Sequence, residues 1–289
     1  MKLTEMKQIL AAGRIQLTKS LGQNFLHDQN QLRRIADAAE LTPADAVLEI
    51  GPGLGPLTEY LLARAGRVLA IEKDLRLVEF LRERFAAESK LTLLHDDALD
   101  YLRRERSDWS DWKLVANLPY SVASPLLVDL AESEGKPKRI TVTLQLEVAH
   151  RLVAGVAAEE YGVLSLLMQL DYEPKGSFKI AADCFFPPPE VDSACVTLER
   201  RSKPLLPPEL RPVFKRLVKV GFSQRRKMML KLLRAAWPAE RLAAAFVTLG
   251  LSPQIRAEKV SLQQFAELAR KLGAGNPGAA EGEDRGTAE

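Results

Sequence analysis

Short apolar runs separated by stretches of helical periodicity mark the first half of the chain. The runs between about residues 45 and 145 are Ala46–Ile50, Val68–Ile71, Leu91–Leu94, Leu114–Ala116 and Ile140–Leu144. Between them, apolar residues recur at helical spacing, as in the sets Leu57, Tyr60, Leu61 and Leu77, Phe80, Leu81. Continuous apolar strands joined by helical crossovers are typical of a parallel sheet with helices on both faces. The pattern therefore predicts an α/β fold.

The pattern changes after Glu147. We expect a helix over 147–153, further strand around 164–172, and a last strand at Ala194–Leu198 that joins the sheet in antiparallel orientation. The proline-rich stretch Lys203–Pro208 then interrupts regular structure and is typical of a linker. Beyond it, the periodicity predicts three or four short helices as far as Leu272.

These patterns divide the chain into a larger domain, a smaller one and a tail. We expect an α/β domain over residues 1–202 and an all-helical domain over 203–272. The Gly/Ala/Glu-rich residues 273–289 are expected to be disordered.

Composition restricts the class of protein. The chain has 289 residues, of which 46% are hydrophobic and 27% charged, which excludes a disordered, fibrous or disulfide-stapled protein. Its two cysteines, Cys184 and Cys195, lie among apolar neighbours and are expected to be core residues in a reducing compartment. Without an apolar run of membrane-spanning length or an apolar N-terminal signal segment, a cytoplasmic protein is expected.

The net charge of +3 hides a strong asymmetry. Residues 35–198 carry 17 Lys and Arg against 27 Asp and Glu, whereas residues 199–271 carry 17 against five. A basic block beside an acidic one indicates a polyanionic partner that binds one end of the molecule. A basic face that only contacts solvent is the alternative.

Candidate chemistry begins at the end of the first strand of the predicted sheet. Gly51, Gly53 and Gly55 follow it, but their spacing differs from the G-x-G-x-x-G of dinucleotide sites, and Pro52 removes an amide that a pyrophosphate would use. The loop therefore favours a nucleoside ligand over NAD. Glu72 ends the second strand, 21 residues after Gly51, where a carboxylate accepts hydrogen bonds from ribose hydroxyls.

Two further strand ends add acceptors. Asp96 and Asp97 end the third strand, where a carboxylate accepts a bond from an adenine amine, although each acid is also typical of a helix cap. An adenosine with a cationic amino-acid tail is S-adenosylmethionine. The fourth strand ends in Asn117-Leu118-Pro119-Tyr120, which offers an amide oxygen, the Leu118 carbonyl and an aromatic face. Two acceptors on the N–H bonds of an adenine amine stabilise the positive charge that develops as it attacks a methyl group.

These motifs carry a resemblance to a known family. The tetrapeptide 117–120 resembles the catalytic motif of adenine-N6 methyltransferases. The segments Gly22–Leu26, Glu49–Gly53, Phe185–Ala194 and Phe222–Lys227 are similar to those of the bacterial small-subunit (16S) ribosomal RNA adenine N6,N6-dimethyltransferases, in the same order and spacing.

The resemblance implies a Rossmann-like S-adenosylmethionine-dependent methyltransferase with a small C-terminal helical domain. It implies dimethylation of two adjacent adenosines in the 3′-terminal hairpin loop of 16S rRNA, on the small subunit or its assembly precursor, with a role in its biogenesis. The cofactor-binding residues that it implies are Asn24, Leu26, Gly51, Glu72, Asp97 and Asn117. Asn117 and Leu118 would bind the target amine, and Tyr120 and Phe185 would stack on the target base, with Asp96 and Phe186 as competitors for the roles of Asp97 and Phe185.

RNA binding is expected from the basic block. We predict a helix over Gln224–Arg234 with Leu230, Leu233 and Trp237 facing the core. The cations expected to contact RNA are Arg225, Arg226, Lys227, Lys231 and Arg234. A monomer is expected, and no metal site, because the three histidines lack acidic or cysteine neighbours at ligand spacing.

Three other functions remain as alternatives. A related dimethyltransferase of large-subunit rRNA is disfavoured by the full helical domain and the segment Pro187–Ala194. An RNA-binding assembly factor without catalysis is disfavoured by intact Asn117 and Tyr120, and a dehydrogenase by the glycine spacing.

Overall fold

The computed structural model describes residues 1–13, 15 and 23–273. It divides into two compact units, and each is described by itself. The first contains the described residues of Met1–Val153 and Tyr172–Arg201, and the second contains Ala154–Asp171 and the described residues from Ser202 to Gly273. The predicted boundary after residue 202 therefore misplaces Ala154–Asp171, whose Tyr161 and Leu166 are buried in the apolar core of the second unit.

The first unit is built on a seven-stranded sheet of order β4-β3-β2-β5-β6-β9-β7. The strands are β2 (Ala46–Ile50), β3 (Arg67–Glu72), β4 (Leu91–His95), β5 (Trp112–Asn117), β6 (Arg139–Gln145), β7 (Tyr172–Ile180) and β9 (Ser193–Arg200). β4, β3, β2, β5 and β6 pair in parallel, and β9 pairs antiparallel with both β6 and β7. The predicted parallel sheet and its last antiparallel strand are confirmed.

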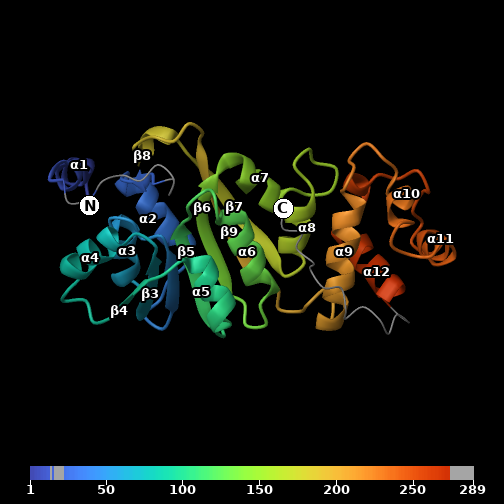
Figure 1. Ribbon diagram of the computed structural model, residues 1–289, viewed down its shortest axis with the longest axis horizontal. Helices are drawn as coiled ribbons and strands as arrows, with labels where there is room; N and C mark the ends of the chain where they lie inside the picture. Colours follow the sequence, from blue (N-terminus) through green and yellow to red (C-terminus); the bar gives the residue numbers. More distant parts are fainter. Residues whose placement is uncertain (14, 16–22, 274–289) are drawn as a thin grey trace, which may run out of the picture. The chain divides into compact units, whose positions relative to one another are not determined.

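Helices cover both faces of this sheet (Figure 1). They are α2 (Gln29–Ala38), α3 (Pro56–Leu62), α4 (Leu75–Arg84), α5 (Ala98–Glu105), α6 (Ala123–Glu132) and α7 (Leu146–Val153). On one face, α2 and α3 bury Leu32 and Leu61 against Val47 and Val115. On the other, α5 and α6 lie side by side. The first unit is thus a three-layer α/β/α structure.

Two small elements lie at the edge where the parallel strands end. β1 (Phe25–Leu26) and β8 (Phe185–Phe186) form a separate two-stranded antiparallel ladder. Helix α1 (Leu3–Ala11) buries Met6 in an apolar cluster with Phe25 and Leu54. The sequence pattern did not predict these elements.

The second unit is helical, as expected. Its helices are α8 (Val163–Gln169), α9 (Arg211–Gly221), α10 (Met229–Leu233), α11 (Ala239–Thr248) and α12 (Leu262–Gly273). They enclose a core that includes Phe214, Phe246 and Phe265. None of the described helices is long and apolar enough to cross a membrane.

Three predictions of local structure were wrong. The apolar run around 164–172 forms helix α8, because Leu166 and Leu170 pack into a helical core, and β7 begins only at Tyr172. The helix predicted over 224–234 is confined to 229–233, because residues 224–228 are all exposed and their turn closes from the Lys227 amide to the Gln224 carbonyl. Gly273, assigned to the tail, ends α12, and residues 274–289 lie outside the described part.

Candidate active site

A pocket opens in the first unit where β2, β3, β4 and β5 end. In doubly wound sheets, ligands bind at this edge, beside the point where the strand order reverses; here that point lies between β2 and β5. The predicted site residues that line the pocket are Asn24, Leu26, Gly51, Glu72, Asp97, Asn117, Leu118 and Tyr120. Phe185 is not among the lining residues.

The glycine loop needs its glycines for two different reasons. Gly51 and Gly53 have φ values of 66° and 61°, a left-handed conformation that residues with a Cβ rarely adopt. At Gly53 a Cβ would also lie 2.7 Å from the Phe25 ring, so a side chain would collide with β1. The Gly53 amide donates to Glu72 Oε2 at 3.1 Å, which joins the loop to the end of β3.

Two carboxylates at the base of the pocket are buried without a cationic partner among the described residues. Burial raises the pKa of Glu72, even though its oxygens accept from the Asp74 and Gly53 amides. Burial raises the pKa of Glu49 to about 8; its Oε2 accepts from Thr58 Oγ1 at 2.8 Å, and Glu72 lies nearby. This part of the pocket is therefore suited to a ligand that carries positive charge.

Asp96 and Asp97 both line the pocket but have different partners. Asp97 caps α5 by accepting from the Leu99 amide at 2.9 Å, and it forms an ion pair with Lys73 Nζ at 2.7 Å. Asp96 forms an ion pair with Arg104 at 2.7 Å. Asp97 therefore has the helix-capping role that the sequence analysis gave as an alternative.

The turn after β5 places an amide oxygen and an aromatic ring at the pocket. The Leu118 amide donates to the Thr143 carbonyl at 3.0 Å, which anchors the turn on β6. Asn117 Nδ2 donates to the Asn24 carbonyl at 3.2 Å, whereas Asn117 Oδ1 is buried and has no hydrogen-bond partner within the described residues. A buried acceptor without a donor is costly, and it indicates a group that a ligand completes.

Phe185, which was predicted to stack on the base together with Tyr120, and its competitor Phe186 are not among the residues that line the pocket. Phe185 is only 2% exposed and packs in the core with Leu26 and Ile180, while its register partner in β1 is Leu26. Phe186 is half-buried beside Lys7, whose Nζ lies 5.4 Å from the ring centroid. Of the predicted aromatic residues, Tyr120 alone lines the pocket.

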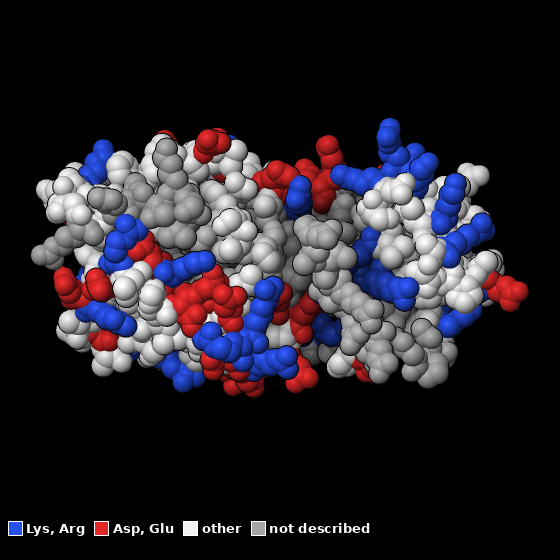
Figure 2. All heavy atoms as spheres, in the orientation of Figure 1, with Lys and Arg blue, Asp and Glu red and all other residues white. Residues whose placement is uncertain are grey.

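Lys and Arg side chains are frequent on the surface of the second unit (Figure 2), and three of its lysines line a groove. Lys227 and Lys231, both predicted, line it together with Lys219, and Val220 and Leu232 form an apolar floor. These three lysines take part in no ion pair among the described residues. Arg226 and Arg234 are exposed outside the lining, and Arg225 donates to the Glu159 carbonyl.

Three residues near these sites were missed by sequence reasoning. Glu49 lies in the segment Glu49–Gly53 that carries the family resemblance, but the pattern of a strand does not show which carboxyl group is buried beneath a loop. Ser193 contacts Tyr120 across 73 residues of sequence, and Lys219 joins the groove from α9. Among the described residues, no group of three or more His, Cys, Asp or Glu is arranged to hold a metal ion.

Strand order and pocket together place the first unit among the Rossmann-like methyltransferases. The sequence profile of the family described as ribosomal RNA adenine dimethylase matches residues 14–273. The chain belongs to this family, and it is an rRNA adenine dimethylase.

Similar proteins span nearly the same length. The chain is 37% identical to "Ribosomal RNA small subunit methyltransferase A" of Geobacter metallireducens over 264 residues, 89% of this chain and 96% of that protein. It is 41% identical to the protein of the same name from Pelotomaculum thermopropionicum over 276 residues, 91% of this chain and 94% of that protein.

Two solved structures share the fold. The 23S rRNA methyltransferase ErmE has a TM-score of 0.69 and 28% identity, with 86% of this chain and 100% of that chain covered. A dimethyladenosine transferase from Plasmodium falciparum has a TM-score of 0.71 and 24% identity, with 84% of this chain and 95% of that chain covered. The Rossmann-like methyltransferase fold predicted from the sequence is confirmed.

Proposed function

We propose that the protein transfers methyl groups from S-adenosylmethionine to the N6 amines of two adjacent adenosines in the 3′-terminal hairpin loop of 16S rRNA. It would act as a monomer in the cytoplasm, on the small subunit or its assembly precursor, and contribute to small-subunit biogenesis. The observation that carries the chemistry is the buried Asn117 oxygen without a donor. The relatives of matching length, named for the small subunit, favour this substrate over large-subunit rRNA.

The pocket fits S-adenosylmethionine in charge and in hydrogen bonding. This cofactor supplies an electrophilic methyl group on a positively charged sulfur. Glu49 and Glu72 are buried without a cationic partner in the described part of the chain, and a cationic ligand favours the ionised form of such carboxyl groups. Glu72 would accept from the ribose hydroxyls, because Oε1 and Oε2 each have a second lone pair beyond the bonds from the Asp74 and Gly53 amides. Asp97 would accept from the adenine amine through Oδ2, which already accepts from Lys73, because Oδ1 accepts from both the Leu99 and Asp100 amides. Asn24 and Leu26 would cover the ligand from β1, and the loop at Gly51 would approach it closely.

Asn117 and Leu118 would act on the target amine. The lone pair of an adenine amine is delocalised into the ring, so the amine is a poor nucleophile. Asn117 Oδ1 and the Leu118 carbonyl would accept its two N–H bonds and stabilise the positive charge that develops on nitrogen. The amine forms a bond to the methyl carbon as the carbon–sulfur bond breaks, and then releases one proton. No strong base is required, because the methylated ammonium is acidic.

Tyr120 would stack on the target base from one side. Stacking on an aromatic ring contributes roughly 1–3 kcal/mol per base. We also propose Phe185 for the second face, which requires the β1–β8 ladder to open, because Phe185 is 2% exposed in this structure.

The groove in the second unit would bind rRNA phosphates. We propose that Arg225, Arg226, Lys227, Lys231 and Arg234 contribute, with Lys219 added from α9. Each phosphate contact releases counterions and contributes roughly 0.7 to 0.9 to the salt slope of binding.

Mapping methylated adenosines tests the function directly. Undermethylated small subunits are incubated with the protein and S-adenosylmethionine, and the 3′-terminal fragment of the 16S rRNA is analysed by mass spectrometry. We expect N6,N6-dimethyladenosine at two adjacent positions of the hairpin loop. Methylation confined to large-subunit rRNA would support the alternative substrate, and binding without methylation would indicate an assembly factor without catalysis.

Charge reversal tests the RNA groove. We expect Lys227→Glu together with Lys231→Glu to weaken rRNA binding and reduce the salt slope by about one to two units. Lys203→Glu with Lys259→Glu changes the net charge equally but lies outside the groove lining, so its slope should change less. Cofactor affinity, measured by calorimetry, should stay unchanged in both. Equal losses in the two pairs would show that only net charge matters.

A further inference from the structure

The ring of Tyr120 is held at its hydroxyl end by the main sheet. Tyr120 Oη and Ser193 Oγ lie 2.6 Å apart, a short hydrogen bond between two neutral groups. Ser193 is completely buried, while Tyr120 is half-buried and lines the pocket. A phenol ring has two torsions, and a bond at its far end restricts both.

Ser193 is itself fixed in position. It is the first residue of β9 and pairs with Gln145 in β6 and Ile180 in β7. The preceding residue, Asp192, accepts from the Leu146 amide at 3.0 Å through its carbonyl and from the Ala182 amide at 3.0 Å through its side chain. The serine hydroxyl therefore moves with the sheet.

The turn that contains Tyr120 is held by hydrogen bonds of its backbone. Its backbone is held by the Leu118 amide on the Thr143 carbonyl and by the Val122 amide on the Pro119 carbonyl. Neither bond restricts the Tyr120 side chain. Among the described residues, the Ser193 hydroxyl is the hydrogen-bond partner of the Tyr120 side chain, and this bond restricts the ring plane.

We infer that Ser193 is a positioning residue, which holds the Tyr120 ring in the plane on which the target base stacks and so favours completion of the second methylation. This inference rests on the proposed function. An unmodified amine presents two N–H bonds to Asn117 Oδ1 and the Leu118 carbonyl, but a monomethylated amine presents one. The orientation of the base in the second transfer therefore depends more on stacking, and hence on the Ser193 bond.

Removing the hydroxyl should shift the products toward the monomethyl form. In single-turnover reactions with equal RNA and saturating cofactor, we expect Ser193→Ala to slow the first transfer about threefold and the second about tenfold, the range for one neutral hydrogen bond. Tyr120→Phe removes the same bond from the other partner and should give the same ratio of monomethyl to dimethyl product. The double variant should be no slower than either single variant, because the two changes remove one interaction.

A second variant in the same strand separates positioning from loss of stability. Thr197 is buried in β9, with Oγ1 3.5 Å from Thr141 Oγ1. Thr197→Val removes a hydroxyl from β9 at a distance from Tyr120, and it should leave the product ratio unchanged whatever its effect on the melting temperature. In RNA with 2-aminopurine at the target position, Ser193→Ala and Tyr120→Phe should both raise the emission of the bound probe, and Thr197→Val should not.

The outcomes distinguish the two proposals. If the wild-type protein forms no dimethyladenosine in this assay, the proposed function is wrong. If the wild type dimethylates while Ser193→Ala and Tyr120→Phe keep its product ratio and probe emission, or their effects on rate add, the positioning role is wrong. If Ser193→Ala does not fold, Tyr120→Phe alone decides, because its hydroxyl lies at a half-buried position beside the pocket.

Discussion

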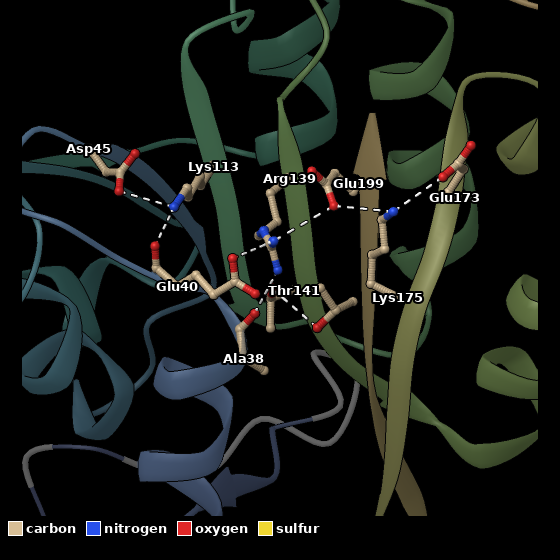
Figure 3. Close-up of polar contacts among 10 residues, drawn as sticks. Ala38, Glu40, Asp45, Lys113, Arg139, Thr141, Glu173, Lys175 and Glu199 are labelled. Atoms are coloured by element: carbon tan, nitrogen blue, oxygen red, sulfur yellow. Dashed lines mark hydrogen bonds and ion pairs between the residues drawn. The ribbon is translucent and has the colours of Figure 1, made fainter. Parts of the chain in front are cut away.

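Buried carboxyl groups have different partners at the two edges of the sheet, where the parallel strands begin and where they end. At the edge where the parallel strands begin, Asp45 accepts from Lys113 at 3.0 Å (Figure 3). It also accepts from Lys138 at 2.7 Å and from the Thr42 amide at 2.8 Å. Burial alone would raise the pKa of Asp45, but the bonds from Lys138 and Lys113 outweigh it and hold the pKa well below its usual range. At the edge where the strands end, burial raises the pKa of Glu49 to about 8.

The pairing at the first edge extends along neighbouring strands. Arg139 at the start of β6 forms an ion pair with Glu40 at 2.7 Å and lies 3.8 Å from Glu199 at the end of β9. Lys175 of β7 bridges Glu199 and Glu173 (Figure 3). Two poorly satisfied buried groups lie instead where β5 and β6 end: Asn117 Oδ1, which has no hydrogen-bond partner among the described residues, and Thr143 Oγ1, which faces only the Cys195 thiol.

The difference shows what separates a structural edge from a binding edge. Both contain buried carboxylates, so burial does not distinguish them. Compensation does. The first edge pairs its charged groups with the chain's own lysines and arginines, whereas the second has two buried carboxyl groups with raised pKa values and no cationic partner among the described residues. The first edge should therefore control stability, and the second should control activity.

Asn117→Ala should show the largest effect. We expect the single-turnover methyl-transfer rate to fall roughly 100-fold or more, because one preorganised acceptor of the amine is lost. The unfolding midpoint should change little, because the deleted oxygen has no partner in the described structure and the lost donor contacts one carbonyl. Near-normal single-turnover transfer would contradict the assignment of this edge.

Asp45→Asn should give the reverse result. Lys113 is buried, and losing its anionic partner should lower the free energy of unfolding by about 3 kcal/mol, while the rate per folded molecule is retained. Glu147→Gln is the control, because it breaks an exposed pair with Arg151 on α7 and should cost less than about 1 kcal/mol. Urea unfolding measures both. Equal losses of unfolding free energy in Asp45→Asn and Glu147→Gln would show that the buried ion pairs of Asp45 stabilise the fold no more than an exposed ion pair does.

The strands and the position of the pocket were predictable because they depend on local pattern. The central strand at Ala46–Ile50 was placed to the residue, since all its side chains are buried and every residue except Glu49 is apolar. The same rule failed at α8, because a continuous apolar run does not distinguish a buried strand from a buried helix. β7 was missed beyond Tyr172 because most of its side chains are exposed.

The candidate site was predictable as a set of residues but not as a set of contacts. Strand ends located Glu72, Asp97 and Asn117, because the carboxyl ends of parallel strands meet at one edge. The Tyr120–Ser193 bond and the β1–β8 ladder join segments far apart in the sequence, and no periodicity shows which residues meet. Whether Phe185 reaches the target base stays a prediction.

The pH dependence of stability should differ in sign between the two edges. Glu49 has a folded pKa of about 8 against about 4.3 unfolded, so its contribution is fully present below about pH 4.3 and is lost as the pH rises through 8. Asp45 has a depressed pKa, so its contribution is present above about pH 3.9 and is lost only as the pH falls through its folded pKa.

Unfolding of the ligand-free protein at pH 6, 7 and 8 tests this. We expect Glu49 to lower the free energy of unfolding by at most about 1.4 kcal/mol per pH unit, and Glu49→Gln, which keeps an acceptor for Thr58, to remove that part of the slope. Glu72, whose pKa burial also raises, adds to the slope in the same direction. Asp45→Asn should lower stability equally at all three values. A slope as steep in Glu49→Gln as in the wild type would assign the titration to another group.

Thr143→Val should give the smallest effect, and one of opposite sign to Asp45→Asn. Thr143 is completely buried, and within the described residues its Oγ1 faces only the weakly hydrogen-bonding thiol of Cys195 across β9, so the loss of hydration of its hydroxyl is poorly compensated. Valine has nearly the same shape, and it should raise the free energy of unfolding by about 0.5–1 kcal/mol. Thr141→Val is the matched control on the same strand, because Thr141 Oγ1 lies 3.5 Å from Thr197 Oγ1 and its loss should destabilise slightly. Denaturant unfolding of the two variants side by side gives the comparison, and destabilisation by Thr143→Val would mean that the hydroxyl is satisfied and that the binding edge contains one free acceptor fewer.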